Sequence, residues 1–462
     1  MDTKLELSPH QSGPRYRVLA DTICQAVARG ELSPGAQLPP VRDLAWTLKI
    51  SPGAVARAYK LGIERGILEA MVGRGTFVRN AGSSPIYAMD GLMDEAATGT
   101  IDLRGNQAVD VGQAAALTRA LERLIARHDG VLPITGYRRR EDDPAALEIF
   151  AGWLREAGVP AEASRLLVTS GAQAGVIAVM SLLGRGGGVA LTTPTIHPGL
   201  RDGAAGIGMR LEAVEADRDG IDPDALDRAC TRARPDAIML TATLQNPTLV
   251  LMSAERRQAV AEIAARHQVP VIEDDVYGQL LPDPPQTFAT LLPDLCWYVA
   301  SLSKSVAAGL RAGFVLTPPG KVMPTFRAYQ ALAHQTPWLV KGLSAEVIES
   351  GEAKAIRAEV AAETARRVQI ADRLLGPVGA ITHPAASFAY LPLPEPWTSA
   401  EFVAAAAAMG VLVPPAAIYR TGRTGDEFTR VALGARVTAS EVEIGLARLA
   451  KLVAEGPGAA VT

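Results

Sequence analysis

The strongest chemical signal in this sequence is a lysine that stands between hydroxyl side chains, directly after a run of apolar residues. The segment reads Ser301-Leu302-Ser303-Lys304-Ser305, and Arg311 follows seven residues after the lysine, between two glycines. A lysine amine forms a Schiff base with an aldehyde, and hydroxyls with a planar guanidinium bind a phosphate dianion. We therefore expect an aldehyde cofactor with a phosphate tail, attached at Lys304 and held by Ser301, Ser303 and Arg311. Taken alone, the segment also fits a solvated strand end.

A second phosphate-binding signal is a glycine at the junction of a predicted strand and a predicted helix. The segment is Val168-Thr169-Ser170-Gly171-Ala172-Gln173. A glycine lets the backbone approach a ligand closely, and the free N–H groups at a helix start attract anions. We expect the backbone at Gly171 and the start of the following helix to approach the phosphate, although such a turn also occurs where nothing binds.

Two polar segments at the ends of further apolar runs suit the ring of an aromatic cofactor. The first is Gln245-Asn246-Pro247-Thr248, in which Asn246 can donate to a phenolate oxygen; an Asn-Pro pair also marks a plain turn. The second is Glu273-Asp274-Asp275-Val276-Tyr277. A carboxylate that faces a pyridine nitrogen keeps it protonated and makes the ring an electron sink, a role that suits Asp274. Tyr277 can reach the ring oxygen. Paired acids at a strand end are more often metal ligands or solvated, but the lysine and phosphate signals favour the ring.

The apolar runs before these polar segments predict the elements that bring them together. Buried strands are predicted at residues 166–169, 189–193, 237–242, 269–274 and 297–301, separated by helical stretches such as Ala254–His267. Strand–helix alternation predicts a mostly parallel sheet with helices on both faces, an α/β fold, followed by a smaller α+β domain. Because such sheets bind ligands at the carboxyl ends of their strands, the polar segments should meet there.

The order of these segments resembles that of the fold type I, aspartate aminotransferase-like family of pyridoxal-phosphate proteins, from about residue 101 onward. The resemblance implies pyridoxal 5'-phosphate as the cofactor and Lys304 as its Schiff-base lysine. It implies Asp274 as the partner of the pyridine nitrogen, and Asn246 and Tyr277 as ligands of the ring oxygen. The phosphate contacts that it implies are Ala172, Gln173, Ser301, Ser303 and Arg311.

Three further positions take their roles from this resemblance alone, and two of them depart from the family pattern. Arg430 matches the residue that binds a substrate carboxylate, with a structural ion pair as the alternative. His197 falls where an aromatic residue, usually Tyr or Trp, covers the cofactor ring; it could also be a plain loop residue. Tyr137 matches a tyrosine that reaches the phosphate of the neighbouring subunit. Asp142 stands where a glycine is common, which leaves the role of Tyr137 open.

Residues 14–79 form a separate predicted unit with the element order of a winged helix. An apolar stripe at Leu19, Ile23 and Val27 predicts the first helix. Further helices are predicted over residues 41–48 and from about 51 to 66, and two short strands flank the turn at 72–75. Ser51 is a plausible N-cap of the third helix, and Pro52 suits its first position.

The same unit resembles the GntR-type winged helix almost end to end. The matching features are the Pro34-Gly35 turn before Leu38-Pro39, the helix with Arg42-Asp43-Leu44-Ala45, and the wing Gly73-Arg74-Gly75-Thr76-Phe77. The resemblance implies double-stranded operator DNA as a partner, with the third helix in the major groove. The predicted DNA contacts are Arg42, Ser51, Arg57, Arg74 and Thr76, and each arginine could instead be a solvated surface charge.

The start of the third helix departs from the GntR pattern. Where that family often has Ser-Arg-Asn-Thr, this chain has Ser51-Pro52-Gly53-Ala54, which removes the Arg and the Asn and Thr donors. Phosphate contacts and DNA shape should then contribute more to binding than base readout does. We therefore expect an altered or relaxed operator preference.

The order of the two parts resembles the MocR subfamily of regulators. The predicted boundaries are a DNA-binding domain at 1–79, a linker at 80–100 and a cofactor-binding domain at 101–462, with a small C-terminal subdomain from about 345. The resemblance implies a transcription regulator, usually a homodimer, that senses pyridoxal phosphate or an amino acid or amine effector through aldimine exchange at Lys304. Two other functions stay open: an active aminotransferase with a DNA-binding head, and a dimeric scaffold with neither activity.

Composition and charge fit a regulator with one DNA-binding end. Residues 1–80 contain eleven Lys or Arg and seven Asp or Glu, a net charge of +4, which leaves −7 for the remaining 382 residues. A basic head on an acidic body is compatible with DNA contact by the head. The three cysteines form no CxxC pair, so neither a disulfide framework nor a metal site is expected. No signal peptide or membrane span is apparent, and we expect a cytoplasmic location.

Overall fold

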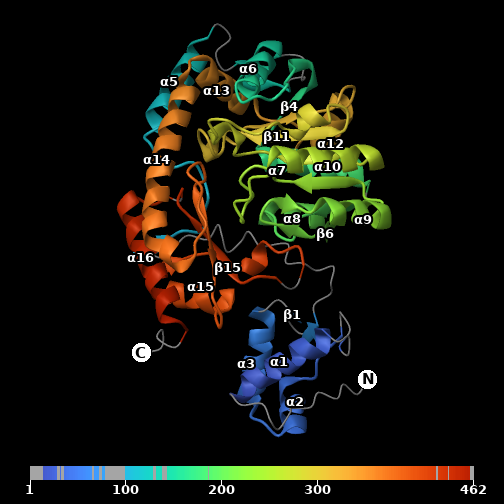
Figure 1. Ribbon diagram of the computed structural model, residues 1–462, viewed down its shortest axis with the longest axis vertical. Helices are drawn as coiled ribbons and strands as arrows, with labels where there is room; N and C mark the ends of the chain where they lie inside the picture. The colour runs from blue at the N-terminus through green and yellow to red at the C-terminus, as the bar shows by residue number, and fades with distance from the viewer. Residues whose placement is uncertain are drawn as a thin grey trace. The chain divides into compact units, whose positions relative to one another are not determined.

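The computed structural model divides the chain into two compact units, residues 1–87 and residues 88–462, and each is described by itself (Figure 1). The structure describes residues 14–28, 32, 36–64, 67–71, 75–78, 99–127, 132–137, 143–185, 187–422, 425–434 and 436–457. The predicted linker at 80–100, apart from its last two residues, lies outside this description, as do Arg74 and Asp142.

The described part of the N-terminal unit has the predicted order of helices followed by a β-hairpin. Its elements are α1 (Arg15–Ala28), α2 (Val41–Leu48), α3 (Pro52–Glu64), β1 (Leu68–Met71) and β2 (Gly75–Val78), with β1 and β2 antiparallel. Leu19, Ile23 and Val55 are fully buried in the core that the helices share with the hairpin. The predicted winged helix is therefore present, and its third helix is described as far as Glu64; the predicted end near Gly66 lies outside the described residues.

The turn between α2 and α3 sets the start of the third helix. Lys49 ends α2 with a left-handed backbone, at a φ of 51°. Ser51 Oγ then accepts a hydrogen bond from the Ala54 N–H at 3.2 Å, which satisfies one of the free donors at the helix start. Pro52 occupies the first helical position, where a missing N–H costs nothing. Both residues thus have the roles predicted for them.

A seven-stranded sheet forms the centre of the C-terminal unit. In spatial order the strands are β4 (Leu166–Thr169), β12 (Gly313–Leu316), β11 (Cys296–Ser301), β10 (Val271–Asp274), β9 (Ala237–Leu240), β5 (Val189–Thr192) and β6 (Arg210–Ala213). β12 runs antiparallel to both of its neighbours, while the other pairs are parallel. All five predicted strands are present, and β6 and β12 are additional.

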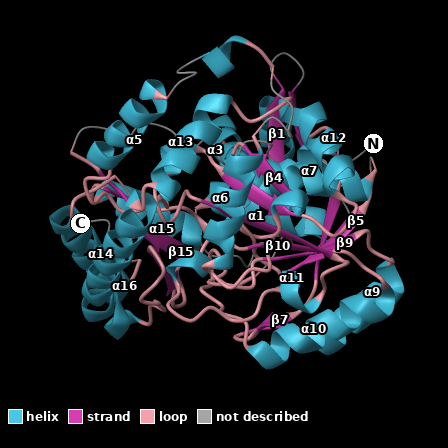
Figure 2. Ribbon diagram, turned by 90° about the horizontal axis from the view of Figure 1, so that it is seen from above, coloured by secondary structure: helices cyan, strands magenta, loops and turns pink. Residues whose placement is uncertain are grey.

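Both faces of this sheet are buried, which explains the continuous apolar runs of its strands. Alternate residues point to opposite sides: Trp297 and Val299 pack into one core, and Tyr298 and Ala300 pack into the other. One face is covered by α7 (Ala172–Gly184), α8 (Pro198–Gly206) and α12 (Val322–Ala333). The other is covered by α6 (Pro144–Arg155), α9 (Pro223–Ala233), α10 (Ala254–His267) and α11 (Phe288–Leu291). Figure 2 shows the strands between these two helical layers.

A second, smaller core gathers elements from both ends of this unit. It contains β13 (Phe388–Pro392), α15 (Ser399–Ala408), β14 (Val411–Leu412), β15 (Phe428–Ala432) and α16 (Ala439–Glu455). The short strand β3 (Ile101–Asp102) pairs with β14 and buries Ile101 and Leu103 there. The smaller core therefore includes residues 101–103, which precede the large sheet in sequence, in addition to the predicted C-terminal segment.

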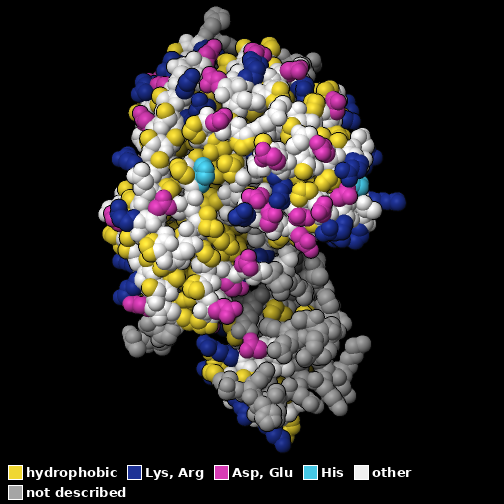
Figure 3. Space-filling view, viewed as in Figure 1, with side chains coloured by type: hydrophobic (Ala, Val, Ile, Leu, Met, Phe, Trp, Pro, Cys, Tyr) yellow, Lys and Arg dark blue, Asp and Glu magenta, His cyan; other side chains and the backbone are white. Residues whose placement is uncertain are grey.

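The helix α14 (Glu352–Leu375) connects the two cores. Its first half packs Ile356 and Val360 against the large core, and its second half packs Val368 and Leu375 into the small one. Figure 1 shows it along one side of the unit, and Figure 3 shows hydrophobic side chains gathered between it and the helices over the sheet. The remaining regular elements are α5 (Ala114–Ala126), α13 (Trp338–Glu349), β7 (Ala216–Asp217) and β8 (Gly220–Ile221).

Membrane-spanning helices are not found in the part of the chain that the structure describes, since no helix there is both long and apolar enough.

Candidate cofactor-binding site

A cavity of about 580 Å³ lies at the carboxyl ends of the central strands, where the sequence predicted a ligand. The predicted residues that line it are Ala172, Gln173, His197, Asn246, Asp274, Tyr277, Ser301, Ser303, Lys304, Arg311 and Arg430. Residues from four separate predicted segments thus meet at one place, together with Arg430 from the smaller core. Gly171 adjoins this lining as the residue before α7, while Tyr137 lies elsewhere.

One end of the cavity is suited to a phosphate group. The helix α7 begins at Ala172 without a side-chain cap, so its first N–H groups are available to an anion. Gly171, at a φ of 89°, precedes it, and a Cβ there would lie 2.5 Å from the Arg311 guanidinium. Only glycine therefore leaves room for Arg311 beside the helix start. Ser301 and Ser303 line the same cavity.

A second glycine, Gly313, allows the strand β12 to pass close to the start of α7. A Cβ on Gly313, the first residue of β12, would lie 2.4 Å from the Gly171 carbonyl carbon and 2.6 Å from the Ala172 nitrogen. The backbone of β12 therefore passes directly against the start of α7. This close approach explains Gly313 at the start of β12 and Gly171 before α7, and it fixes the phosphate end of the cavity.

Lys304 lies half-buried in the site, and its amine contacts one carbonyl among the described residues. Its Nζ donates a hydrogen bond to the Asn106 carbonyl at 2.5 Å. Burial, together with the nearby charges of Arg430 and Arg311, lowers the pKa of this amine to about 8, although Asp274 acts in the opposite direction. A larger fraction of the amine is therefore neutral near pH 7 than for an exposed lysine, as reaction with an aldehyde requires.

Asn106, which the sequence did not predict as a site residue, links Lys304 to Tyr277. Its side-chain Nδ2 donates to the Tyr277 hydroxyl at 2.8 Å, and its Oδ1 accepts from Ser387 at 2.7 Å. Tyr277 is buried, and burial raises the pKa of its hydroxyl. Asn106 follows Gly105 and the two-residue strand β3, which is too short a pattern to have marked it as a site residue.

The predicted ring ligands Asp274 and Asn246 each have a buried oxygen that lacks a hydrogen-bond partner. These atoms are Asp274 Oδ1 and Asn246 Oδ1. Burial, and then the neighbouring Asp275, raise the pKa of the Asp274 carboxyl to about 7. An unpaired buried carboxylate oxygen is costly, so its presence in the cavity indicates that a donor belongs there. A protonated ring nitrogen is such a donor, and the residues present therefore fit pyridoxal phosphate.

A buried ion pair holds the strand ends beneath Asp274. Arg257, from α10, contacts Glu273 at 2.9 Å and donates to the Ala242 carbonyl at 3.0 Å and to Thr243 at 2.8 Å. Asp275 accepts from the Tyr298 hydroxyl at 2.9 Å. Arg257 thereby ties the ends of β9 and β10 together. The sequence did not reveal this role, because Arg257 stands beside Arg256 in a helix rich in charged residues.

His197 lines the cavity as a neutral side chain. Its Nδ1 accepts a hydrogen bond from the Gly199 N–H at 3.2 Å and so caps the start of α8. Burial, and then the charges of Lys304 and Arg430, lower its pKa to about 3. The ring is therefore uncharged at neutral pH and can lie against an aromatic ligand, as the resemblance implied.

Arg430 is a buried cation on β15 with room for one more partner. It donates to the Arg104 carbonyl, and its guanidinium lies 6.0 Å from the Phe388 ring centroid and 5.7 Å from that of Tyr419. Its Nε has no hydrogen-bond partner. No ion pair is recorded for it among the described residues, which supports the predicted carboxylate role over a structural salt bridge.

Tyr137 is the predicted cofactor ligand that the structure does not bring to this cavity. Its side chain is 85% exposed and packs edge-on against His334 at 4.7 Å. It lines a different cavity, of about 680 Å³, with Ile134, Trp338 and Leu339. Its predicted contact with a neighbouring subunit stays a prediction.

Three of the predicted DNA contacts of the N-terminal unit, Arg42, Ser51 and Arg57, are exposed. Arg42 and Ser51 lie on the surface. Arg57 is exposed but engaged: it donates to the Gly53 carbonyl at 3.2 Å and lies 5.7 Å from the Tyr16 ring centroid. Thr76 is half-buried, and its carbonyl accepts from the Leu38 N–H. Arg74 lies outside the described residues.

No group of His, Cys, Asp and Glu side chains in the described part of the chain is arranged to hold a metal ion.

The fold and the cavity together define an aminotransferase-like protein preceded by a winged helix. Residues 102–449 match the family described as aminotransferase class I and II, and residues 15–78 match the bacterial regulatory proteins of the gntR family. The chain belongs to the aminotransferase class I and II family and carries a GntR helix-turn-helix domain ahead of that region.

Its relatives share this layout or this fold. The uncharacterized HTH-type transcriptional regulator YdeF of Bacillus subtilis is 28% identical over 441 residues, which cover 95% of this chain and 94% of that protein. The vitamin B6 salvage pathway transcriptional repressor PtsJ of Salmonella typhimurium is 30% identical over 310 residues, which cover 66% of this chain and 67% of that protein. The crystal structure of LysN, an alpha-aminoadipate aminotransferase from Thermus thermophilus, superimposes on this structure with a TM-score of 0.73 at 20% sequence identity. The match covers 82% of this chain and 98% of the LysN chain. The predicted fold is thereby confirmed.

Proposed function

We propose that this chain is a DNA-binding transcription regulator whose C-terminal unit holds pyridoxal phosphate and senses an amino acid at Lys304. One observation carries the proposal: a single cavity is lined by Lys304, by Asp274 with its unpaired Oδ1, and by Arg311 beside the uncapped start of α7. These groups suit the aldehyde, the ring nitrogen and the phosphate of that cofactor. The winged helix supplies contacts to double-stranded operator DNA.

The protein's own residues prepare the site for the cofactor. Pyridoxal phosphate, when bound, supplies an aldehyde that bonds reversibly to amines and a ring that withdraws electrons. Lys304, with its lowered pKa, would provide its neutral amine form more readily than an exposed lysine. Asp274 would provide the acceptor for the ring nitrogen, Asn246 and Tyr277 would contact the ring oxygen, and Arg311 with the start of α7 would hold the phosphate.

The effector class follows from Arg430. A buried guanidinium with an unpaired Nε matches a carboxylate, so an amino acid suits the site better than a simple amine. Arg430 belongs to the smaller core, whereas Lys304 follows a strand of the larger one. A ligand that contacts both favours the arrangement in which the cores approach each other. Such a ligand shifts the DNA-bound population by its differential affinity for the two arrangements.

The proposal includes a homodimer. Tyr137 is 85% exposed beside an apolar cavity, and so is available to a second copy of the chain. Exposed tyrosines that combine apolar area with a polar tip are frequent in protein interfaces.

A catalytically active aminotransferase is the second candidate, because the cavity that suits a sensor also contains the groups that transamination needs. The amine of Lys304 and the carboxylate site at Arg430 line the same space, within reach of one amino acid. The two functions differ in whether the ligand leaves as a product.

A spectroscopic titration separates these functions. The purified protein is loaded with pyridoxal phosphate, then titrated with amino acids and simple amines while its visible absorption is followed. We expect a band that Lys304→Ala lacks, and a lasting shift with one amino acid that Arg430→Gln weakens by about tenfold or more. A band that decays while a keto acid accumulates at a useful rate would support the aminotransferase. A wild-type protein without any such band would refute cofactor binding.

A further inference from the structure

The N-terminal unit carries an exposed tryptophan that its fold does not explain. Trp46, on α2, has 87% of its side chain exposed. Among the described residues of this unit it is the exposed large apolar side chain, whereas Trp153, Trp297 and Trp397 of the other unit are buried. The indole of Trp46 buries almost no apolar area within its own unit, so its ring and its N–H are both available for contact with a partner.

Positive charges lie near Trp46 at both ends of α2. Leu44 and Ala45 are buried in the core of the unit, which leaves Arg42, Asp43 and Trp46 on the exposed side of the helix. Arg42 lies four residues before Trp46 and Asp43 three residues before it, so both are its helix neighbours. Lys49 is exposed directly after the helix, where it ends α2 with a left-handed backbone. A flat apolar ring beside an arginine, with a lysine at the end of the same helix, matches a polyanion that has apolar parts.

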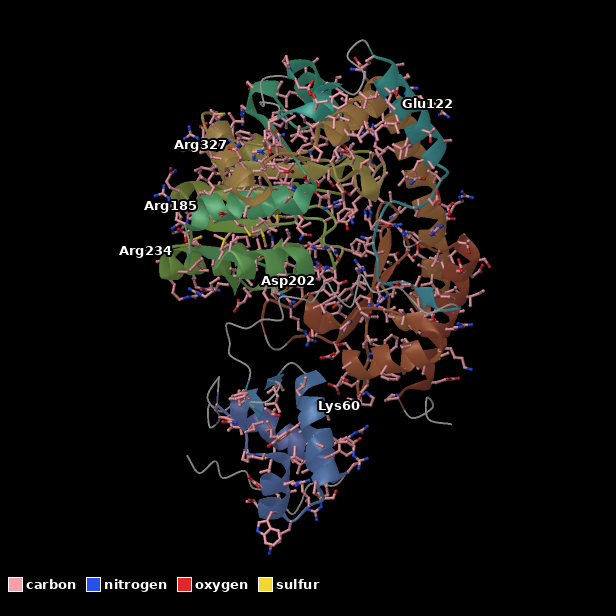
Figure 4. The ribbon with its side chains drawn as sticks, turned by 180° about the vertical axis from the view of Figure 1, so that it is seen from behind. Lys60, Glu122, Arg185, Asp202, Arg234 and Arg327 are labelled. Atoms are coloured by element: carbon pink, nitrogen blue, oxygen red, sulfur yellow. The ribbon has the colours of Figure 1, made fainter. Side chains whose placement is uncertain are left out.

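The neighbouring recognition helix presents few donors of its own. The exposed positions in the first turns of α3 are Pro52, Gly53 and Ala56, none of which has a side-chain hydrogen-bond donor. Arg57 is engaged with Gly53 and Tyr16, and Lys60 follows one turn later on the same helix (Figure 4). Binding to DNA must then depend more on contacts outside the base edges.

We infer that Trp46, flanked by Arg42 and Lys49, is a contact to the DNA sugar–phosphate backbone. The indole N–H can donate to a phosphate oxygen, and the ring can pack on a deoxyribose, while the cations pair with the adjacent phosphates. The inference rests on the proposed DNA-binding function and extends it to a residue outside the recognition helix and the wing. Because the contact is to the backbone, it acts on any duplex sequence.

A binding experiment with a generic duplex tests this contact without knowledge of the operator. The full-length protein, loaded with pyridoxal phosphate, is titrated against a fluorescein-labelled mixed-sequence duplex of about 30 bp at about 50 mM salt. We expect Trp46→Ala to weaken binding about tenfold and Trp46→Phe, which keeps a ring without the N–H, to weaken it less. The slope of affinity against salt should stay unchanged in both, because no charge is removed. Arg42→Gln should reduce that slope by about one.

Two controls make the result specific to Trp46. Ile444→Ala removes a 45% exposed apolar side chain from α16 of the other unit and should bind as the wild type does. Thermal unfolding should be the same for Trp46→Ala and the wild type, because this side chain makes little contact with the fold. In the wild type, bound duplex should reduce the quenching of Trp46 fluorescence by acrylamide. The contribution of Trp46 is obtained by subtracting the quenching measured for Trp46→Phe, which retains the other tryptophans.

The outcomes distinguish the failure of this contact from the failure of the proposed function. A wild-type protein that binds the duplex while Trp46→Ala binds equally well would overturn the contact alone. The same holds if Trp46→Ala changes the oligomeric state instead of DNA affinity, which would make Trp46 a protein contact. A wild-type protein that binds no duplex even at low salt would overturn the DNA-binding function itself.

Discussion

Burial shifts three titratable side chains of the cavity toward their neutral forms. Burial is the largest influence on the pKa values of Lys304, lowered to about 8, of His197, lowered to about 3, and of Asp274, raised to about 7. Near neutral pH, His197 is therefore uncharged, Asp274 is partly protonated, and Lys304 has a larger neutral fraction than an exposed lysine. The unpaired Asp274 Oδ1 shows what this arrangement costs while no donor faces it.

Asp274 should therefore reduce the stability of the cofactor-free protein above neutral pH. Its pKa is higher in the folded state than in the unfolded state, so the folded state binds more protons between about pH 4 and pH 7. The unfolding free energy falls as pH rises through that window. We predict that Asp274→Asn, without cofactor, is more stable than the wild type at pH 8 by roughly 2–4 kcal/mol, with a smaller difference at pH 4.

Urea unfolding of the two proteins at pH 4 and pH 8 measures this effect. The same variant should lose affinity for pyridoxal phosphate, since the acceptor for the ring nitrogen has lost its charge. Identical dependence of stability on pH in both proteins would contradict a raised pKa at Asp274.

Individual side chains differed in how well the sequence predicted them. Lys304, Asp274 and Arg311 follow apolar runs at strand ends, where position and residue type together indicate a ligand. Asn106 and Arg257 had no such signal: the first contacts Tyr277 from 171 residues away, and the second resembles a surface arginine on a polar helix. Their roles depend on packing between distant segments, which single-chain patterns do not encode.

Close backbone approach between two elements shapes the phosphate end of the cavity. Gly171 and Gly313 let β12 pass against the start of α7, and they leave space for the Arg311 guanidinium. The sequence indicated the glycine before the helix but not the strand β12, since the short run Gly313–Leu316 lacks a clear boundary after the Gly309–Gly313 segment. The start of α7 could be predicted from local pattern, whereas its contact with β12 could not.

Replacing Gly171 by alanine should disrupt cofactor binding. A Cβ there would lie 2.5 Å from Arg311 in a backbone conformation that L side chains rarely adopt, so the guanidinium must move away from the helix start. We predict that Gly171→Ala weakens binding of pyridoxal phosphate about tenfold or more, as followed by visible absorption. Gly206→Ala, at an open position that ends α8, is the matched control. Equal cofactor affinity in the two variants would argue against a phosphate site at Gly171.

Two segments join the large and small cores of the C-terminal unit. The helix α14 packs against both, and the segment after β3 runs from the small core into the cavity. There the carbonyls of Arg104 and Asn106 accept hydrogen bonds from Arg430 and Lys304. A ligand that competes for these two cations replaces contacts that link the cores, which gives a physical route from ligand binding to a change in their arrangement.

The order of the winged-helix unit and the α/β unit could be predicted from the sequence, because the two units differ in their succession of predicted helices and strands. The boundaries of the small core could not be predicted from such a succession. Its strand β3 precedes the whole large sheet in sequence and pairs with β14 from near the other end of the chain. Long-range pairing of two-residue strands leaves no local pattern, so the prediction placed residues 101–103 with the large domain.

The most direct test of a ligand-sensing regulator measures cofactor chemistry and DNA binding in one sample. The wild type and Lys304→Ala, both incubated with pyridoxal phosphate, are bound to a duplex that the wild type itself enriched from genomic fragments. Visible absorption and DNA anisotropy are then followed as an amino acid is added. We predict that the amino acid that shifts the wild-type band also changes DNA affinity about fivefold or more, and that Lys304→Ala shows neither change. A band that shifts while DNA affinity stays constant would contradict the account.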